Sequence, residues 1–400
     1  MTDLADKLKA IKPSPTLAVT AKVAEMRAAG EDVISLGAGE PDFDTPDHIK
    51  EAAIKAIWEG KTKYTKVDGI PELKEAVALK FRRDNGLEYG ADQISINCGG
   101  KHTIYNALVA TLNPGDEVLI PKPYWVSYPD MVRLVGAEPV FIDTSPDTGL
   151  KVTPDALEAA ITPQTKWFIF NSPSNPTGVG YSHDEIAGLG EVLLRHPRVM
   201  ILSDDIYEHI VYDGFAFSTM AAVVPDLYGR TLTTNGVAKA YAMTGWRIGF
   251  AGGPADLIKA MAKVQSQSTS NPCSVSQWAS VEALTGSQDF LAERCKAFEQ
   301  RRNFVVGKIG EIAGLECLNP NGAFYVFVNC LAYIGKKTPS GGTIGSDLDF
   351  VAYLLDSQAV ATVPGGAFGM ADHFRISYAT SLDALKEAFE RIGEACRALA

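Results

Sequence analysis

The sequence predicts an α/β protein, with a mostly parallel sheet of about seven strands in a large domain and a smaller α+β domain after it. Two observations predict this class. From about residue 94 to residue 252, short apolar runs alternate with stretches of helical periodicity, which is typical of βαβ units. After about residue 285 a long charged helical stretch begins, followed by mixed short strands and helices.

The predicted strands of the large domain are short apolar runs between helical stretches. They are Ile94–Asn97, Glu117–Ile120, Pro139–Ile142, Trp167–Phe170, Met200–Leu202, Thr231–Thr234 and Arg247–Ala251. The C-terminal part is expected to contain a helix at Phe290–Ile312, a strand at Phe324–Val328, a helix at Leu348–Leu355, a strand at Phe374–Ser377 and a last helix. Thr380 and Asp383 resemble a capping box that opens this last helix.

These patterns divide the chain into three parts. We predict an N-terminal segment over residues 1–45, a large ligand-binding domain over 46–285 and a small C-terminal domain over 286–400. The first segment has too few apolar positions to form a core of its own. We therefore expect it to pack on the small domain or on a partner subunit.

Composition excludes several classes of function. The formal net charge is −11, whereas nucleic-acid binding needs a basic surface, so we expect no nucleic-acid partner. No apolar run approaches the roughly 18 residues that span a bilayer, and we expect no membrane partner. The six cysteines are scattered without a C-x-x-C pair, which argues against a metal site or disulfides and favours reduced thiols in the cytoplasm.

A parallel sheet binds its ligand at the carboxyl ends of its strands, so polar residues just after strands are the first candidates. Gly99-Gly100-Lys101 follows a strand and opens a helix, a setting that suits a phosphate, although two glycines at such a turn are often structural. The segment 171–178 follows another strand and presents Asn175. It is equally consistent with a rigid turn.

Two further strand ends carry charge. Asp204 follows the strand predicted at Met200–Leu202, and a carboxylate at the buried end of a strand needs a cationic partner. This partner could be a protonated pyridine nitrogen or an ordinary arginine. Lys239 lies at a strand end among small residues, a setting that lowers a lysine pKa and favours imine chemistry. Arg247 offers a planar fork to a phosphate. Taken singly, both of these cations also fit a surface role.

The stretch from Gly236 to Gly249 resembles the cofactor-attachment signature of class I aminotransferases, which use pyridoxal 5′-phosphate (PLP). Other motifs of that family occur in order along nearly the whole chain: Gly37–Phe43, Lys63-Tyr64, Gly99–Lys101, Pro123–Trp125, Asn175–Gly178, Asp204 with Tyr207, and Phe374–Ala379. The resemblance implies the fold type I of PLP-dependent transferases. Within the family it is strongest to bacterial aspartate aminotransferases of the branch that includes prephenate aminotransferases.

The resemblance implies a role for each matching residue. Lys239 would hold PLP as a Schiff base and move the substrate proton, and Asp204 would keep the ring nitrogen protonated. Arg375 would bind the substrate α-carboxylate. The other implied cofactor ligands are Tyr207 and Asn175 at the ring 3-oxygen, Trp125 at the ring or substrate, Gly100, Lys101 and Arg247 at the phosphate, and Tyr64 from the partner subunit of a homodimer. Gly39 would allow the N-terminal segment to close over the substrate.

The sequence departs from the family pattern at one position, and the identity of the substrate stays open. Ala238 stands where many relatives carry a phosphate-binding serine, so we expect one contact fewer. Lys12 matches a lysine linked in this branch to dicarboxylate and prephenate recognition, although by itself it would be a solvated lysine. The resemblance implies amino-group transfer between L-aspartate and 2-oxoglutarate. Prephenate, or an aromatic or other amino acid, stays open as a substrate.

Three rival functions would each require features that can be compared with the sequence. A β-lyase, decarboxylase or cyclopropane-carboxylate synthase could use the same fold with PLP. A PLP-binding regulatory domain normally carries a DNA-binding module, and the chain has no basic segment for one. A nicotinamide-dependent dehydrogenase would need a G-x-G-x-x-G motif after its first strand, which the sequence lacks.

Overall fold

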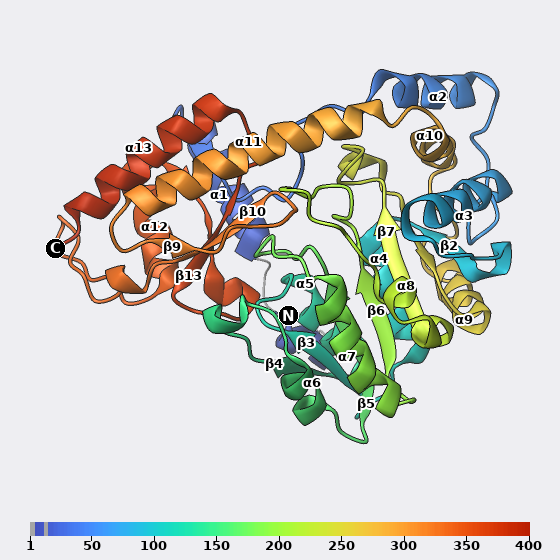
Figure 1. Ribbon diagram of the computed structural model, residues 1–400. Helices are drawn as coiled ribbons and strands as arrows, with labels where there is room; N and C mark the ends of the chain where they lie inside the picture. Colours follow the sequence, from blue (N-terminus) through green and yellow to red (C-terminus); the bar gives the residue numbers. More distant parts are fainter. Residues whose placement is uncertain (1–4, 12–14) are drawn as a thin grey trace.

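The computed structural model describes residues 5–11 and 15–400 and contains a seven-stranded sheet (Figure 1). The strands lie in the order β2-β8-β7-β6-β5-β3-β4. They are β2 (Ile94–Asn97), β3 (Glu117–Pro121), β4 (Glu138–Ile142), β5 (Thr165–Asn171), β6 (Met200–Asp204), β7 (Thr231–Gly236) and β8 (Gly249–Gly252). Only β8 pairs antiparallel with its neighbours within this sheet. The predicted class, α/β with a mostly parallel sheet, is confirmed.

Helices cover both faces of this sheet, which explains why its strands are apolar throughout. On β5, Trp167 and Ile169 face one core with α4, α5 and α9, whereas Phe168 and Phe170 face a second core with α6 and α7. The two sets alternate because successive side chains of a strand point to opposite faces. The helices are α4 (Gly100–Thr111), α5 (Ser127–Leu134), α6 (Pro154–Ala160), α7 (His183–Arg195), α8 (Met220–Val223) and α9 (Ala255–Ser266).

A third group of helices packs at the β2 edge of the sheet. It consists of α2 (Asp47–Trp58), α3 (Pro71–Asn85) and α10 (Ser274–Thr285). Figure 1 shows the long helix α11 (Asp289–Glu311), in orange, running from this group toward α13 (Leu382–Ala398). Helix α11 therefore connects the large sheet with the C-terminal part of the chain.

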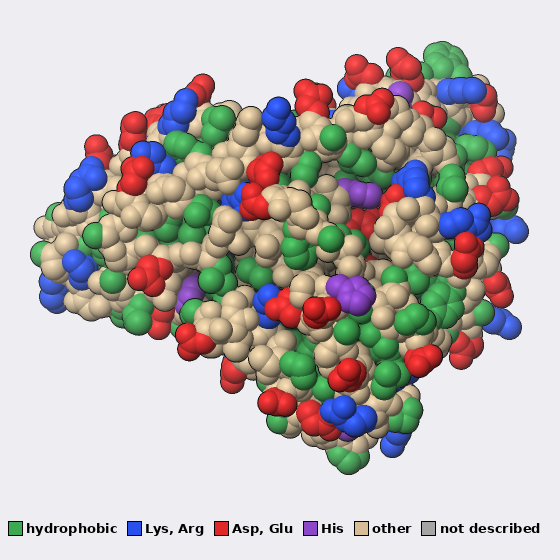
Figure 2. Space-filling model, viewed as in Figure 1, with side chains coloured by type: hydrophobic (Ala, Val, Ile, Leu, Met, Phe, Trp, Pro, Cys, Tyr) green, Lys and Arg blue, Asp and Glu red, His purple; other side chains and the backbone are tan. Residues whose placement is uncertain are grey.

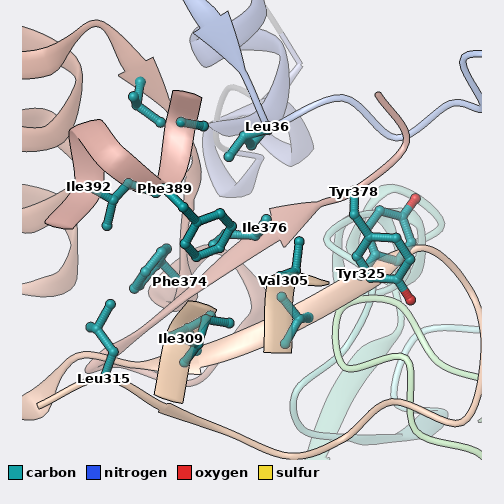
Figure 3. Close-up of a cluster of buried hydrophobic side chains, with 14 of the residues drawn as sticks. Leu36, Val305, Ile309, Leu315, Tyr325, Phe374, Ile376, Tyr378, Phe389 and Ile392 are labelled. Carbon is teal, nitrogen blue, oxygen red and sulfur yellow. The ribbon is translucent and has the colours of Figure 1, made fainter. Parts of the chain in front are cut away.

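The C-terminal part is built on a four-stranded antiparallel sheet in the order β12-β13-β10-β9. Its elements are β9 (Glu316–Cys317), β10 (Tyr325–Asn329), α12 (Asp347–Gln358), β12 (Val363–Pro364) and β13 (His373–Ser377). Figure 3 shows Phe374, Ile376, Phe389 and Ile392 converging in the buried core between this sheet and its helices. The predicted smaller α+β unit is present, whereas the boundaries at 45 and 285 stay predictions.

The described residues of the N-terminal segment contact two different parts of the chain. Strand β1 (Ile34–Ser35) pairs in parallel with β11 (Val360–Ala361), and α1 (Pro15–Ala28) contacts β12. Both contacts are made with strands of the C-terminal part, while the assignment of residues 1–45 as a separate segment stays a prediction. The short 3-10 helix η1 (Asp6–Ala10) instead contacts α5 of the large domain, which the sequence did not predict.

Two local predictions need correction. The last predicted strand of the large domain begins at Gly249 rather than at Arg247, because Arg247 has a left-handed backbone with φ 57° and belongs to the turn before β8. Ser381, and not Thr380, caps α13, since its hydroxyl accepts the Ala384 N–H. The remaining 3-10 helices are η2 (Ala91–Gln93), η3 (Pro146–Thr148), η4 (Pro225–Arg230), η5 (Thr244–Trp246), η6 (Leu331–Tyr333) and η7 (Gly365–Phe368).

The surface carries charges of both signs. Figure 2 shows acidic and basic side chains interspersed over one face of the molecule. Within residues 5–11 and 15–400, no helix combines the length and the apolar character needed to cross a membrane.

Candidate active site

A cavity of about 1110 Å³ lies at the carboxyl ends of the parallel strands, between the large sheet and the small domain. This is where a parallel α/β sheet is expected to bind its ligand. Ten of the predicted site residues line it: Gly39, Gly100, Lys101, Trp125, Asn175, Asp204, Tyr207, Lys239, Arg247 and Arg375. Tyr64 is not among the lining residues, and Lys12 lies outside the described residues.

Lys239 follows β7 and points its amine into this cavity. Its Nζ donates a hydrogen bond to the Gly39 carbonyl at 2.5 Å. Burial, and after it the charge of Arg375, lowers the pKa of Lys239 to about 8. A larger fraction of the amine is therefore neutral near physiological pH than for an ordinary lysine, and a neutral amine is the form that attacks a carbonyl.

Asp204 is the last residue of β6 and is only 7% exposed. Its Oδ2 accepts a hydrogen bond from the Tyr128 hydroxyl at 2.5 Å. Burial raises the pKa of Asp204 to about 6, although the Tyr128 hydrogen bond opposes this rise. No lysine or arginine in the described part of the chain forms an ion pair with it, so the carboxylate can still receive a cation from a ligand.

The raised pKa of Asp204 predicts a pH-dependent stability difference. The pKa of Asp204 in the folded protein lies above the value of about 4 expected in the unfolded chain. The protonated carboxyl therefore contributes its full stabilisation below pH 4. This contribution is lost as pH rises through about 6. Asp204→Asn, which cannot ionise, should raise the free energy of unfolding of the ligand-free protein at pH 8 by about 1–3 kcal/mol. This difference should shrink toward pH 4 in denaturant titrations.

Asp213→Asn is the control for that experiment, because the pKa of this more exposed carboxyl is shifted in the opposite direction. Arg302 holds the pKa of Asp213 below its ordinary value, so the stability contributed by ionised Asp213 is present above about pH 4. Its removal should lower stability at pH 8. Equal stability of Asp204→Asn and the wild type at pH 8 would contradict the raised pKa of Asp204.

Three groups form an anion site at the start of α4. Gly99 has φ 93°, and a Cβ there would lie 2.4 Å from Nη2 of Arg247, so glycine is required for the guanidinium to approach. Arg247 donates to the Thr244 carbonyl at 2.8 Å. Burial, followed by the charge of Arg247, lowers the pKa of Lys101. These cations and the helix N-terminus at Gly100 together favour a phosphate or another anion.

Arg375 lies on β13 and faces Lys239 across the cavity from the small domain. The guanidinium, 2% exposed, donates to Asn175 Oδ1 at 2.9 Å and to the Gly37 carbonyl at 2.7 Å. Both acceptors are neutral, and the Arg375 Nε has no hydrogen-bond partner among the described residues. A buried guanidinium without an anion is suited to bind a carboxylate from a ligand.

Further side chains surround the centre of the cavity. The Tyr207 hydroxyl lies 2.9 Å from the hydroxyl of Tyr325, whose ring lies 4.5 Å from the Arg375 guanidinium carbon. Trp125 lines the wall, with the Lys101 amine 5.1 Å from its ring centre. Since Asn175 already accepts from Arg375 through Oδ1, its Nδ2 is the atom that can donate to a ligand.

The structure gives different support to Gly39 and Tyr64. A Cβ at Gly39 would meet only the Tyr325 hydroxyl, at 3.4 Å, which is ordinary contact, so crowding does not explain glycine here and its role in closure stays a prediction. The Tyr64 side chain is 91% exposed. Its exposure leaves it available to a second subunit.

Sequence reasoning missed several residues of the site. Tyr128, Tyr325 and Asn171 line the cavity. Asn171 accepts the Asn175 N–H and donates to the Asp204 carbonyl, which ties two strand ends together. Asn171 could have been found because it directly follows an apolar strand. The two tyrosines lie among apolar neighbours and look like ordinary core residues.

A separate, partly buried cluster of charges lies outside the cavity. Asp84, Glu208 and His209 place potential metal-binding atoms within 4.8 Å of one another. The Lys80 amine, however, contacts Glu208, and Arg83 pairs with Asp84 at 2.6 Å. Because these two cations already balance the two carboxylates, the cluster is an ion-pair network of the protein itself.

Comparison with known proteins connects this geometry to a family. Residues 31–392 match the family model described as aminotransferase class I and II. The chain is 59% identical over 399 residues to an aspartate/prephenate aminotransferase of Cereibacter sphaeroides, covering 100% of both chains. It is 57% identical over 392 residues to an aspartate aminotransferase of Rhizobium meliloti, covering 98% of this chain and 96% of the other.

Solved structures agree in fold over the whole chain. A crystal structure of the aspartate aminotransferase from Rhizobium meliloti superposes with a TM-score of 0.97 at 56% identity, covering 100% of both chains. The aspartate aminotransferase of Thermus thermophilus with maleate gives a TM-score of 0.92 at 44% identity, covering 99% of this chain and 100% of the other.

Proposed function

Because the chain belongs to the class I and II aminotransferases, we propose that it transfers an amino group between L-aspartate and 2-oxoglutarate. The products would be oxaloacetate and L-glutamate, with PLP as cofactor, and prephenate would serve as a further amino acceptor. The chain's similarity to an aspartate/prephenate aminotransferase and to aspartate aminotransferases supports these substrates.

One observation carries the proposal. The same cavity is lined by a lysine amine of lowered pKa, a buried carboxylate and a buried guanidinium. These are Lys239, Asp204 and Arg375. Neither the carboxylate nor the guanidinium has an ion-pair partner among the described residues. An amino acid bound through its carboxylate at Arg375 would bring its Cα toward the Lys239 amine, which can take up and return the Cα proton.

The donor set fits PLP. Gly100, Lys101 and Arg247 would hold the phosphate at the start of α4, where a Cβ on Gly99 would collide with the guanidinium. Asp204 would pair with the ring nitrogen, and Tyr207 and Asn175 would donate to the ring 3-oxygen. When bound, PLP supplies an aldehyde that captures amines and a ring that accepts electrons from the substrate Cα. Lys239 would bind its aldehyde carbon.

Dicarboxylate recognition needs a second cation besides Arg375, and we assign it to Lys12. The segment next to it supports this choice, because η1 lies against α5, whose residues Pro129, Asp130 and Met131 line the cavity. The Thermus thermophilus structure was solved with maleate, itself a dicarboxylate. Lys12 thus becomes the residue that separates dicarboxylic from monocarboxylic substrates.

We also propose a cytoplasmic homodimer with shared active sites. The exposed Tyr64 side chain would reach the phosphate of the partner subunit, which explains why it lies outside its own cavity. All six cysteines are unpaired, which is consistent with a reducing compartment.

A substrate panel tests the proposed reaction. The purified protein should show a visible absorbance band from bound PLP and should convert aspartate only when 2-oxoglutarate or prephenate is supplied. With 2-oxoglutarate as the acceptor, oxaloacetate and glutamate should form in equimolar amounts. Release of pyruvate or ammonia from aspartate without an acceptor would instead identify a lyase, and the transaminase proposal would be rejected.

The same panel applied to Lys12→Ala tests the substrate assignment. We expect kcat/KM for aspartate and prephenate to fall about tenfold or more, as for one lost charge-assisted hydrogen bond. A monocarboxylic amino acid such as alanine should change by less than about twofold. Equal losses for all substrates would assign Lys12 to folding or closure of the N-terminal segment.

A further inference from the structure

Tyr128 links two walls of the cavity, and none of the roles assigned above includes it. It is the second residue of α5 and is 2% exposed. Burial raises the pKa of its hydroxyl well above the ordinary value, so the group keeps its proton and always donates. Its recipient is Oδ2 of Asp204, at 2.5 Å.

This hydrogen bond restricts how the Asp204 carboxylate can turn. A carboxylate rotates about a single bond, and a charge-assisted hydrogen bond to one oxygen holds that rotation. The backbone of Ile206 also bonds to the carboxylate. Tyr128 is thus the side chain that holds Oδ2, and it shares the orientation of the carboxylate with the Ile206 backbone.

The ring of Tyr128 makes a second contact. It meets Trp125 edge to face, with ring centres 5.2 Å apart and an interplanar angle of 90°. Such pairs have a preferred geometry, so Tyr128 also supports the orientation of the indole. Trp125 and Asp204 come from different segments, and Tyr128 contacts both.

We propose that Tyr128 is a positioning residue that aligns the Asp204 carboxylate with the edge of the cofactor ring and the Trp125 indole with its face. This inference rests on the proposed function, in which both groups contact one ring. Tyr128 acts through them and needs no contact with substrate. Its hydroxyl bonds to Asp204 and its ring contacts Trp125. The contribution of the hydroxyl and the contribution of the ring can therefore be separated by substitution.

Tyr128→Phe removes the hydroxyl and keeps the ring. We expect PLP to dissociate about tenfold faster and kcat to fall about tenfold, as for the loss of one hydrogen bond to a charged group. KM for aspartate should change less than twofold, because Arg375 is untouched. The pH titration of the visible absorbance should also shift, since the carboxylate facing the ring nitrogen becomes more basic without its donor. Lys239, the other group that acts on this carboxylate in the ligand-free protein, would be bound to PLP in the wild type and the variant alike, so it does not distinguish them.

Tyr89→Phe is the matched control. Tyr89 is also buried, and its hydroxyl lies 3.0 Å from Thr233 Oγ1, away from the cavity lining. This variant should lose a buried tyrosine hydrogen bond to a neutral partner and leave PLP dissociation and the absorbance titration as in the wild type. If Tyr128→Phe behaves like Tyr89→Phe in both measurements, the positioning role is wrong.

A double substitution tests whether the hydroxyl acts through Asp204. In an Asp204→Ala background, Tyr128→Phe should change PLP dissociation less than twofold, because the recipient is gone. A full tenfold effect in that background would overturn the proposal. Tyr128→Leu, which also removes the ring, should weaken PLP binding further than Tyr128→Phe. Equal effects of the two substitutions would show that the ring of Tyr128 does not position Trp125.

The proposed function and this inference fail in distinguishable ways. A wild-type protein without a visible PLP band or without transaminase activity would reject the proposed function. A wild type that binds PLP and transaminates, together with a Tyr128→Phe variant unchanged in PLP dissociation and in the absorbance titration, would reject the positioning role alone.

Discussion

Lys239→Ala is expected to abolish the visible absorbance of lysine-bound PLP and to lower kcat by at least about four orders of magnitude. The variant loses both the amine that binds the cofactor aldehyde and the group that carries the substrate Cα proton. The neighbours of Lys239 in the cavity, Asp204 and Arg375, carry no basic amine, and Lys101 lies at the anion site. Absorbance spectra and a coupled assay for oxaloacetate measure the two losses.

Lys74→Met is the control for Lys239→Ala. Lys74 is also buried, and its amine bonds to Asp68 and to the Ala91 carbonyl, outside the cavity lining. Its substitution should lower stability but keep the absorbance and the turnover per folded molecule. Normal turnover in Lys239→Ala would refute the central assignment, whatever the other residues do.

Arg375→Lys is expected to raise KM for every amino-acid substrate by about 100-fold, or on the order of 3 kcal/mol, because a lysine cannot form the bidentate pair with the α-carboxylate. All amino acids carry that carboxylate, so aspartate and alanine should suffer alike. Steady-state kinetics with both substrates give the answer. A loss confined to dicarboxylates would assign Arg375 to the distal carboxylate instead.

Arg302→Lys separates this effect from the cost of changing a buried arginine. Arg302 is 1% exposed and donates to the Pro320 carbonyl and to Asp213, away from the cavity lining. Its substitution should lower the free energy of unfolding and leave KM unchanged. Arg375 differs because its acceptors are neutral, so its substitution should cost less stability than that of Arg302.

The strand pattern predicted the fold because parallel strands covered on both faces are short continuous apolar runs, as in β5 and β6. The same pattern located Asp204 and Asn175, since polar residues directly after such strands gather at one edge of the sheet. Arg375 could not be found in this way. It lies within β13 of the small domain, and only the resemblance of Phe374–Ala379 to a family motif indicated it.

Local sequence patterns did not identify the correct residue where its role depended on contacts in the folded chain. Thr380 and Ser381 are both suitable caps for α13, and the turn geometry selects Ser381. Tyr128 lies on a helix that also contributes Met131 and Val132 to the hydrophobic core. Its partner Asp204 is 76 positions away in sequence, so no local pattern marks it as part of a site.

The sequence by itself determined the α/β class, the order of strands and helices, and the chemical types that gather at the strand ends, because periodicity and side-chain chemistry are local properties. The tertiary structure alone decided which of these groups meet. The Gly39 carbonyl faces a lysine 200 positions later, and Asn175 faces an arginine equally distant. Burial at that meeting point is what lowers the pKa of Lys239 and raises that of Asp204, and burial exists only once the chain has folded.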